Sequence, residues 1–133
     1  MNLIDFTQSI LLLLQSRQHL IATKQQLETI SYQQLIHQPF NTKKKNRSIQ
    51  VIVKSYFWAC RLVQGCDCLP RSIALYQNLK SAGYQVEHKF GVNKGDKELA
   101  AHAWVEYQGE PLNEAEDLYS RFTVLENPSE SLK

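Results

Sequence analysis

Cys68 and His102 are the two residues of this chain whose types and surroundings could carry out chemistry together. Cys68 stands in Cys68-Leu69-Pro70-Arg71, which predicts the start of a helix because proline suits the first helical turn. His102 stands in the segment Ala-His-Ala-Trp-Val-Glu at 101–106, which predicts a strand. A helix N-terminus favours a thiolate, and an imidazole on a facing strand can take the thiol proton. The two residues therefore predict a nucleophile–base pair.

The hairpin after His102 decides which residue could orient the imidazole, a role that such a pair requires. A two-residue turn at Gln108-Gly109 needs a positive φ at Gln108, which is unfavourable, and it would turn Glu114 to the other face. A three-residue turn with only Gly109 left-handed would place Glu114 directly opposite His102, with about 4.5–5.5 Å between their Cβ atoms. We therefore predict the three-residue turn and Glu114 as orienter, with Asn113 as the alternative if the turn has two residues.

Three more residues are candidates for the surroundings of this pair. An acyl-transfer intermediate needs hydrogen-bond donors for its oxyanion, and the backbone N–H of Cys68 and the side-chain amide of Gln64 could supply them. Gln64 could equally lie on a solvated helix face. Trp104 shares a strand face with His102, where it is either core or a shield against water. His88 alternates with apolar residues, so it is either packed or lines the cleft.

The other cysteines predict neither a metal site nor a cross-link. Cys66 and Cys68 have the spacing C-x-C, whereas zinc sites use C-x₂-C, and no second pair of ligands follows. Cys60 falls on the apolar side of an expected helix, where a cysteine is a small buried side chain. Residues 1–5 lack the positively charged region of a secretory signal. We therefore expect a cytoplasmic protein with reduced, unbridged thiols and no cofactor.

Length and composition describe an ordinary globular chain. Its 133 residues correspond to one domain, or to one domain with an extension. The formal net charge of +2 gives no strong electrostatic case for a nucleic-acid partner. The apolar run at 10–14 is far too short to span a membrane.

The pattern of apolar residues changes from a helical period to alternation after residue 83. Helical spacing and capping residues predict the helices, and alternation with turn residues predicts the strands. The expected elements are helical segments within 3–38, a basic linker at 40–47, helices at 48–65 and 68–83, and strands at 86–92, 101–107 and 110–113. Helices followed by an antiparallel sheet predict an α+β fold. We divide the chain into a helical extension with linker, 1–47, and a core, 48–133.

Several of these residues together resemble the leader peptidase of lasso-peptide biosynthesis, of the McjB C-terminal type, a branch of the transglutaminase-like cysteine-protease superfamily. The resemblance covers about residues 48–125. It rests on Cys68-Leu69-Pro70-Arg71-Ser72-Ile73-Ala74-Leu75, Leu79, Gly83, Gly91-Val92, Ala101-His102-Ala103-Trp104-Val105-Glu106, Gly109 and Asn113-Glu114.

The resemblance implies a papain-like core in which a helix headed by the nucleophile packs on an antiparallel sheet. It implies that Cys68 is the nucleophile and His102 the base. The third member in such proteins is usually an aspartate at the position of Glu114. Here the glutamate either takes that role or passes it to Asn113, as an asparagine serves in papain-like proteases.

The resemblance also implies a function, which is removal of the leader from a ribosomally made precursor peptide. In such systems a separate recognition protein presents the leader, and an ATP-dependent cyclase closes the ring on the freed amine. The extension, 1–47, could receive the recognition protein. Two other functions use the same residues: a transglutaminase-like acyltransferase, which passes the acyl group to an amine, and a peptide-binding module without catalysis.

Overall fold

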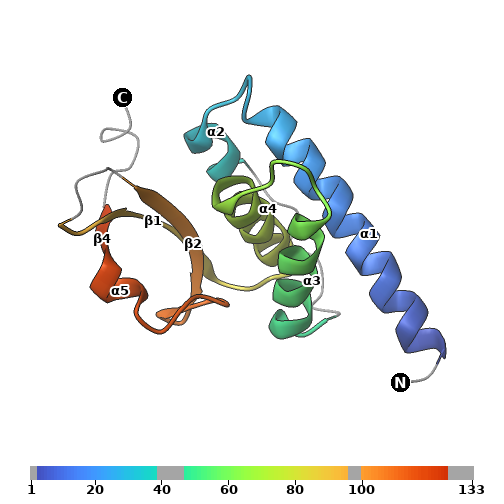
Figure 1. Cartoon of the computed structure of the whole chain (residues 1–133). Coiled ribbons are helices and arrows are strands. Elements are labelled where there is room, and N and C mark those ends of the chain that lie inside the picture. Colours follow the sequence, from blue (N-terminus) through green and yellow to red (C-terminus); the bar gives the residue numbers. More distant parts are fainter. Residues whose placement is uncertain (1–2, 39–46, 96–99, 126–133) are drawn as a thin grey trace.

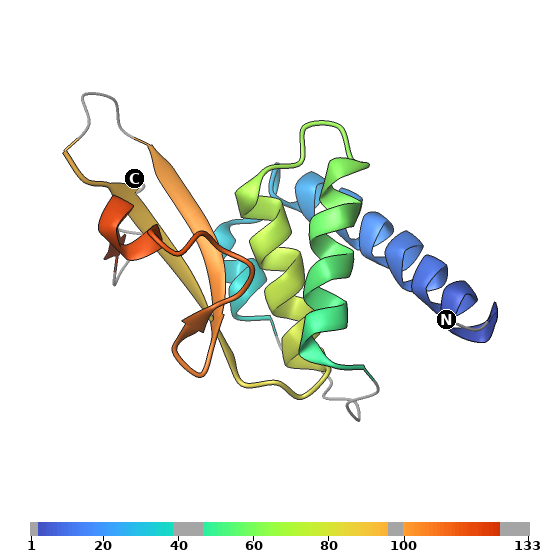
Figure 2. The same ribbon diagram turned by 60° about the horizontal axis from the view of Figure 1, so that its bottom comes forward.

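The computed structural model describes residues 3–38, 47–95 and 100–125, so most of the predicted basic linker lies outside the described residues. Its first four helices form one side of the molecule, and the strands with the short last helix form the other (Figures 1 and 2). Helix α4 (Cys68–Ser81) lies between the sheet and the pair α1 (Leu3–Gln26) and α3 (Ile49–Arg61). The elements are α1 (Leu3–Gln26), α2 (Tyr32–Ile36), α3 (Ile49–Arg61), α4 (Cys68–Ser81), β1 (Val86–Asn93), β2 (Ala101–Tyr107), β3 (Glu110–Pro111), α5 (Leu118–Arg121) and β4 (Phe122–Leu125). The predicted α+β class is confirmed.

Helix α3 begins as predicted and ends earlier than predicted. Ser48 is its N-cap, and the Ser48 side chain accepts a hydrogen bond from the Val51 N–H. The helix ends at Arg61, and the bonds of the next two residues reach back only three positions, which tightens the last turn. Gly65, with φ +73°, therefore lies beyond the helix, and the predicted end of this helix at residue 65 is wrong.

Helix α4 carries Cys68 as its first residue and lies at the centre of the fold. The Asp67 side chain caps it by accepting from the Leu69 N–H. Gly83, with φ +93°, follows the C-cap, where a left-handed residue lets the last carbonyls find partners. The predicted start and end of this helix are confirmed, so the cysteine stands at the positive end of the helix dipole.

The four-stranded antiparallel sheet has the order β3-β2-β1-β4. The predicted three-residue turn between β2 and β3 is wrong, because Tyr107 pairs with Glu110 and both Gln108 (φ 53°) and Gly109 (φ 80°) are left-handed. Such a turn matches the right-handed twist of the strands, which offsets the roughly 1 kcal/mol or more that a left-handed Gln108 costs. The predicted third strand shortens to two residues, and α5 and β4 were not predicted.

The main buried cluster joins α1 to α3, α4 and the sheet. Its buried members are Leu20, Ile52, Val53, Tyr56, Ala59, Cys60, Ala74, Leu75, Leu79, Val86, Val105 and Leu112. His19 on α1 strengthens this junction, with Nδ1 2.6 Å from the Tyr56 hydroxyl and Nε2 2.8 Å from Gln77 Oε1. The C-terminal half of α1 therefore supports the helix that carries Cys68, and the division of the chain at residue 47 stays a prediction.

Truncating Leu20 tests whether α1 contributes to the folded core. Leu20 is fully buried, so Leu20→Ala should lower the free energy of unfolding by about 2–5 kcal/mol. Leu14 on the same helix is 52% exposed, and Leu14→Ala should change the free energy of unfolding by less than about 0.5 kcal/mol. Urea denaturation followed by circular dichroism measures both. Equal, small effects would show that α1 is not part of the core.

Candidate active site

The thiol of Cys68 and the imidazole of His102 meet at an open edge of strand β2. Strand β3 pairs only with Glu106 and Tyr107, which leaves the first part of β2 uncovered on that side. The half-buried Cys68 side chain reaches this edge, close enough to the His102 side chain and the backbone of Ala103 for both to lower the pKa of its thiol. The structure therefore brings together the two residues that the sequence predicts as a pair.

Glu114 holds the other side of the imidazole. Its Oε1 lies 2.5 Å from His102 Nε2, and the two side chains are 7% and 22% exposed. Because Nε2 faces the carboxylate, Nδ1 is the ring nitrogen left for the thiol. A carboxylate in this place fixes the tautomer and the orientation of the ring.

The contact with Glu114 forms by a route that the sequence analysis did not foresee. The turn has two residues, the case in which Asn113 was expected to take the orienting role. The ladder ends at Pro111, however, and Asn113 is left-handed, with φ 54°. The chain changes direction there, which brings Glu114 to His102 and leaves the Asn113 side chain exposed.

The pair is arranged to exchange a proton. Burial raises the pKa of Cys68, but its hydrogen bonds to His102 and Ala103 more than offset this, so the pKa lies below its ordinary value. The hydrogen bonds to Cys68 and Glu114 raise the pKa of His102 to about 9, against the opposing effect of burial. A lowered pKa of the thiol beside a raised pKa of the imidazole favours the thiolate–imidazolium form of the pair, which is the reactive form of a cysteine nucleophile.

Aromatic rings pack against the imidazole and fix its plane. The Trp104 ring stacks at 5.8 Å between centroids, and the Phe122 ring lies 5.4 Å away. Gly91 pairs with His102 across the sheet, and a Cβ there would lie 2.9 Å from atoms of both Trp104 and Phe122. Position 91 therefore needs a glycine for this packing, and Trp104 is both buried and in contact with the pair.

A buried carboxylate anchors the tryptophan. Trp104 Nε1 donates to Glu106 Oε2 at 2.8 Å, and the Tyr119 hydroxyl donates to the same oxygen. Tyr119 and Phe122 come from α5 and β4, which carry no periodic signal long enough to predict. Neither residue could therefore be predicted from the sequence.

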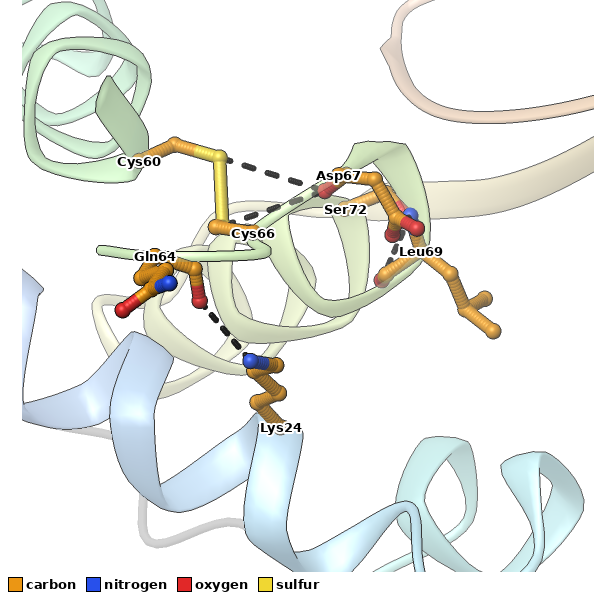
Figure 3. The surroundings of a disulfide bond; sticks show 7 residues. All are labelled: Lys24, Cys60, Gln64, Cys66, Asp67, Leu69 and Ser72. Atoms are coloured by element: carbon orange, nitrogen blue, oxygen red, sulfur yellow. Dashed lines mark hydrogen bonds between the residues drawn. A yellow bond between two sulfur atoms is a disulfide. The ribbon is translucent and has the colours of Figure 1, made fainter. Parts of the chain in front are cut away.

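Two candidate residues lie away from the pair. Gln64 is exposed on the side of α1, where its main-chain oxygen accepts from Lys24 Nζ at 2.8 Å (Figure 3). His88 is packed between helices, with Nε2 2.8 Å from Ser72 Oγ and Nδ1 3.0 Å from the Tyr32 hydroxyl. Burial lowers the pKa of His88 to about 3, so its ring is neutral. Of the two alternatives predicted for His88, the structure shows the packed one.

Cys60 and Cys66 form a disulfide, contrary to the expectation of unbridged thiols (Figure 3). That expectation rested on the reducing conditions of the cytoplasm. The tight turn after α3 brings the two Cα atoms to 5.6 Å, which is an ordinary spacing for a disulfide. Cys68 is the free cysteine of the described residues. In the same residues no three side chains of His, Cys, Asp or Glu gather as a metal site would require.

A helix headed by a cysteine and packed on an antiparallel sheet that carries a histidine is consistent with a transglutaminase-like α+β core. The model of the Transglutaminase-like superfamily (Transglut_core3) matches residues 9–127, and the chain belongs to this superfamily. The superfamily includes cysteine proteases and acyltransferases. No curated protein and no solved structure matches the chain. Within the described parts of the chain, no helix has the length and apolar character needed to cross a membrane.

The ionisation of Cys68 should depend on His102. The rate of alkylation by iodoacetamide follows the thiolate, so its midpoint in pH should lie below about 8.5 in the wild type. In His102→Ala the midpoint should rise to that value or above it, since burial then acts on the thiol without its main opposing contact. Mass spectrometry of the Cys68 peptide measures the rate. His37→Ala, at the exposed C-cap of α2, is the control, and identical midpoints in wild type and His102→Ala would contradict the pairing.

Proposed function

We propose that this chain is a cysteine peptidase that removes the leader from a ribosomally made lasso-peptide precursor in the cytoplasm. The observation that carries the proposal is the Cys68–His102–Glu114 geometry at the start of a buried helix. Membership of a superfamily that includes cysteine proteases supports the reaction class. The resemblance of the cysteine and histidine segments to lasso-peptide leader peptidases supports the substrate.

The chemistry follows from the ionised pair. The Cys68 thiolate attacks the scissile carbonyl, and the oxyanion that forms is stabilised by the Cys68 N–H at the start of α4. The His102 imidazolium gives its proton to the leaving amine, and a thioester remains. His102 then takes a proton from water, whose oxygen attacks the thioester. The bond to sulfur breaks, the acid is released, and the Cys68 thiolate and His102 imidazolium are restored. Glu114 orients the ring throughout. Gln64 is not included as an oxyanion donor, because its exposed position on the α1 side gives this role no support.

Substitution of the nucleophile tests this proposal. With the precursor peptide, its recognition protein and the purified chain, Cys68→Ala should lower the rate of leader removal by at least about a thousandfold. Cys66→Ala removes the neighbouring disulfide and should keep most of the activity. Mass spectrometry of the products measures both. Equal losses would contradict a nucleophilic role for Cys68, and an added amine incorporated in place of water would identify an acyltransferase.

We further propose that the recognition protein docks on the N-terminal half of α1. An apolar stripe stands exposed there, on the side opposite the buried Leu12 and Ser16. Its members are Leu3, Phe6, Ile10 and Leu14. Exposed apolar stripes of this kind mark interaction surfaces.

Charges placed on the stripe test the docking site. Phe6→Glu/Ile10→Glu should weaken binding of the recognition protein at least tenfold in calorimetry. Gln8→Glu/Gln15→Glu adds the same charge at exposed polar positions of α1 and should leave the affinity unchanged. Equal affinities for both double variants would show that the partner binds elsewhere.

A further inference from the structure

A groove beside the candidate active site carries three cations and two aromatic rings. Its volume is about 540 Å³. One stripe of α3, with the spacing i, i+3, i+4 and i+7, forms its floor. The lining residues are Lys54, Phe57, Trp58, Cys60, Arg61, Cys66, Arg71 and Asn113. We name this surface the cationic groove.

The cations of the groove form no ion pair within the described residues, although the charge of Arg71 interacts with Glu114, Cys68 and Asp67. None of its lining residues is acidic, and no carboxylate of the described residues lies within ion-pair distance of Lys54, Arg61 or Arg71. Their N–H groups are therefore available to a ligand. A guanidinium presents two parallel donors that match the two oxygens of a carboxylate.

Aromatic rings hold both guanidinium groups in place. The Arg71 guanidinium lies 4.0 Å from the centroid of the Phe57 ring, and that of Arg61 lies 4.7 Å from the Trp58 ring. Stacking of this kind orders the donors before a ligand arrives, which lowers the entropy lost on binding. Trp58 is 60% exposed, so its ring also offers an apolar surface to a peptide.

The groove adjoins the residues that would carry the reaction. Arg71 stands one helical turn after Cys68 on α4, and its charge interacts with both Glu114 and Cys68. At the other edge, Asn113 directly precedes Glu114. A peptide whose carbonyl lies at the thiol can therefore place a nearby side chain in the groove.

We propose that the cationic groove binds an acidic side chain of the peptide substrate, close to the bond that is cut. The effect of this binding on cleavage rests on the proposed function. The carboxylate pairs with the guanidinium groups and Lys54, while the neighbouring part of the peptide lies on Trp58. The same charges disfavour a lysine or arginine at that place in the peptide, so the groove selects among substrates.

Binding to the inactive chain tests the groove without any reaction. Fluorescein-labelled peptides that differ only in carrying two glutamates, two glutamines or two lysines are titrated into Cys68→Ala by fluorescence anisotropy. The glutamate peptide should bind at least tenfold more tightly than the glutamine peptide. The difference should shrink in 0.5 M NaCl, because the Debye length, about 10 Å at 0.1 M salt, becomes shorter as the salt concentration rises.

Two charge-matched variants locate the effect. Lys54→Gln/Arg61→Gln, made in the Cys68→Ala chain, should abolish the preference for glutamate. Arg17→Gln/Lys80→Gln removes the same charge away from the groove and should keep the preference. Equal binding of the glutamate and glutamine peptides, or equal loss of the preference in both double variants, would overturn the proposal.

Cleavage of the same peptides by the wild type separates the two proposals. If the glutamate preference in binding is present but no peptide or precursor is cut, the groove stands and the peptidase proposal fails. If peptides are cut but the glutamate peptide has no lower KM than the glutamine peptide, the peptidase proposal stands and the groove proposal fails.

Discussion

The contact of the His102 imidazole with Glu114 is the interaction on which the rest of the site depends. A thiol at a helix start gains a little acidity from the dipole, but the half-buried Cys68 needs a positively charged neighbour to ionise at neutral pH. His102 can be that neighbour only if it keeps its proton, and its contact with Cys68 together with the Glu114 carboxylate at 2.5 Å favours the protonated ring. The carboxylate thus acts on the sulfur through the imidazole.

This contact restricts the surrounding fold in two ways. The backbone must turn at the left-handed Asn113 to deliver Glu114, and the strand opposite His102 must carry a glycine. The absent side chain at Gly91 gives room to Trp104, which stacks on the imidazole and donates to a buried carboxylate. The open edge of β2 then leaves a place for the sulfur.

Local signals predicted the parts of the fold that local physics determines. Ser48 caps α3, Gly83 ends α4 and alternation gives β2, because each depends on a few neighbouring residues. The turn at Gln108 was predicted wrongly, since strand twist, which no local pattern shows, outweighs the cost of a left-handed residue. The Cys60–Cys66 disulfide was not predicted, because the prediction of reduced thiols followed from an expected cytoplasmic location. The geometry of the turn, which brings the two cysteines together, is a property of the folded chain.

The candidate pair followed from residue types, whereas its surroundings required tertiary structure. The sequence separation of 34 between Cys68 and His102 hides their proximity, yet the chemistry of the two residue types identified them. The cations of α3 were visible at helical spacing, but a polar stripe is usually only a solvated face, and its place beside the thiol comes from packing.

The most direct test is the ionisation of His102, followed by nitrogen NMR of the labelled ring, with His102→Gln for assignment. We predict a ring protonated at pH 7.5 that titrates near pH 9, whereas titration near 6.5, as for a free imidazole, would contradict the account.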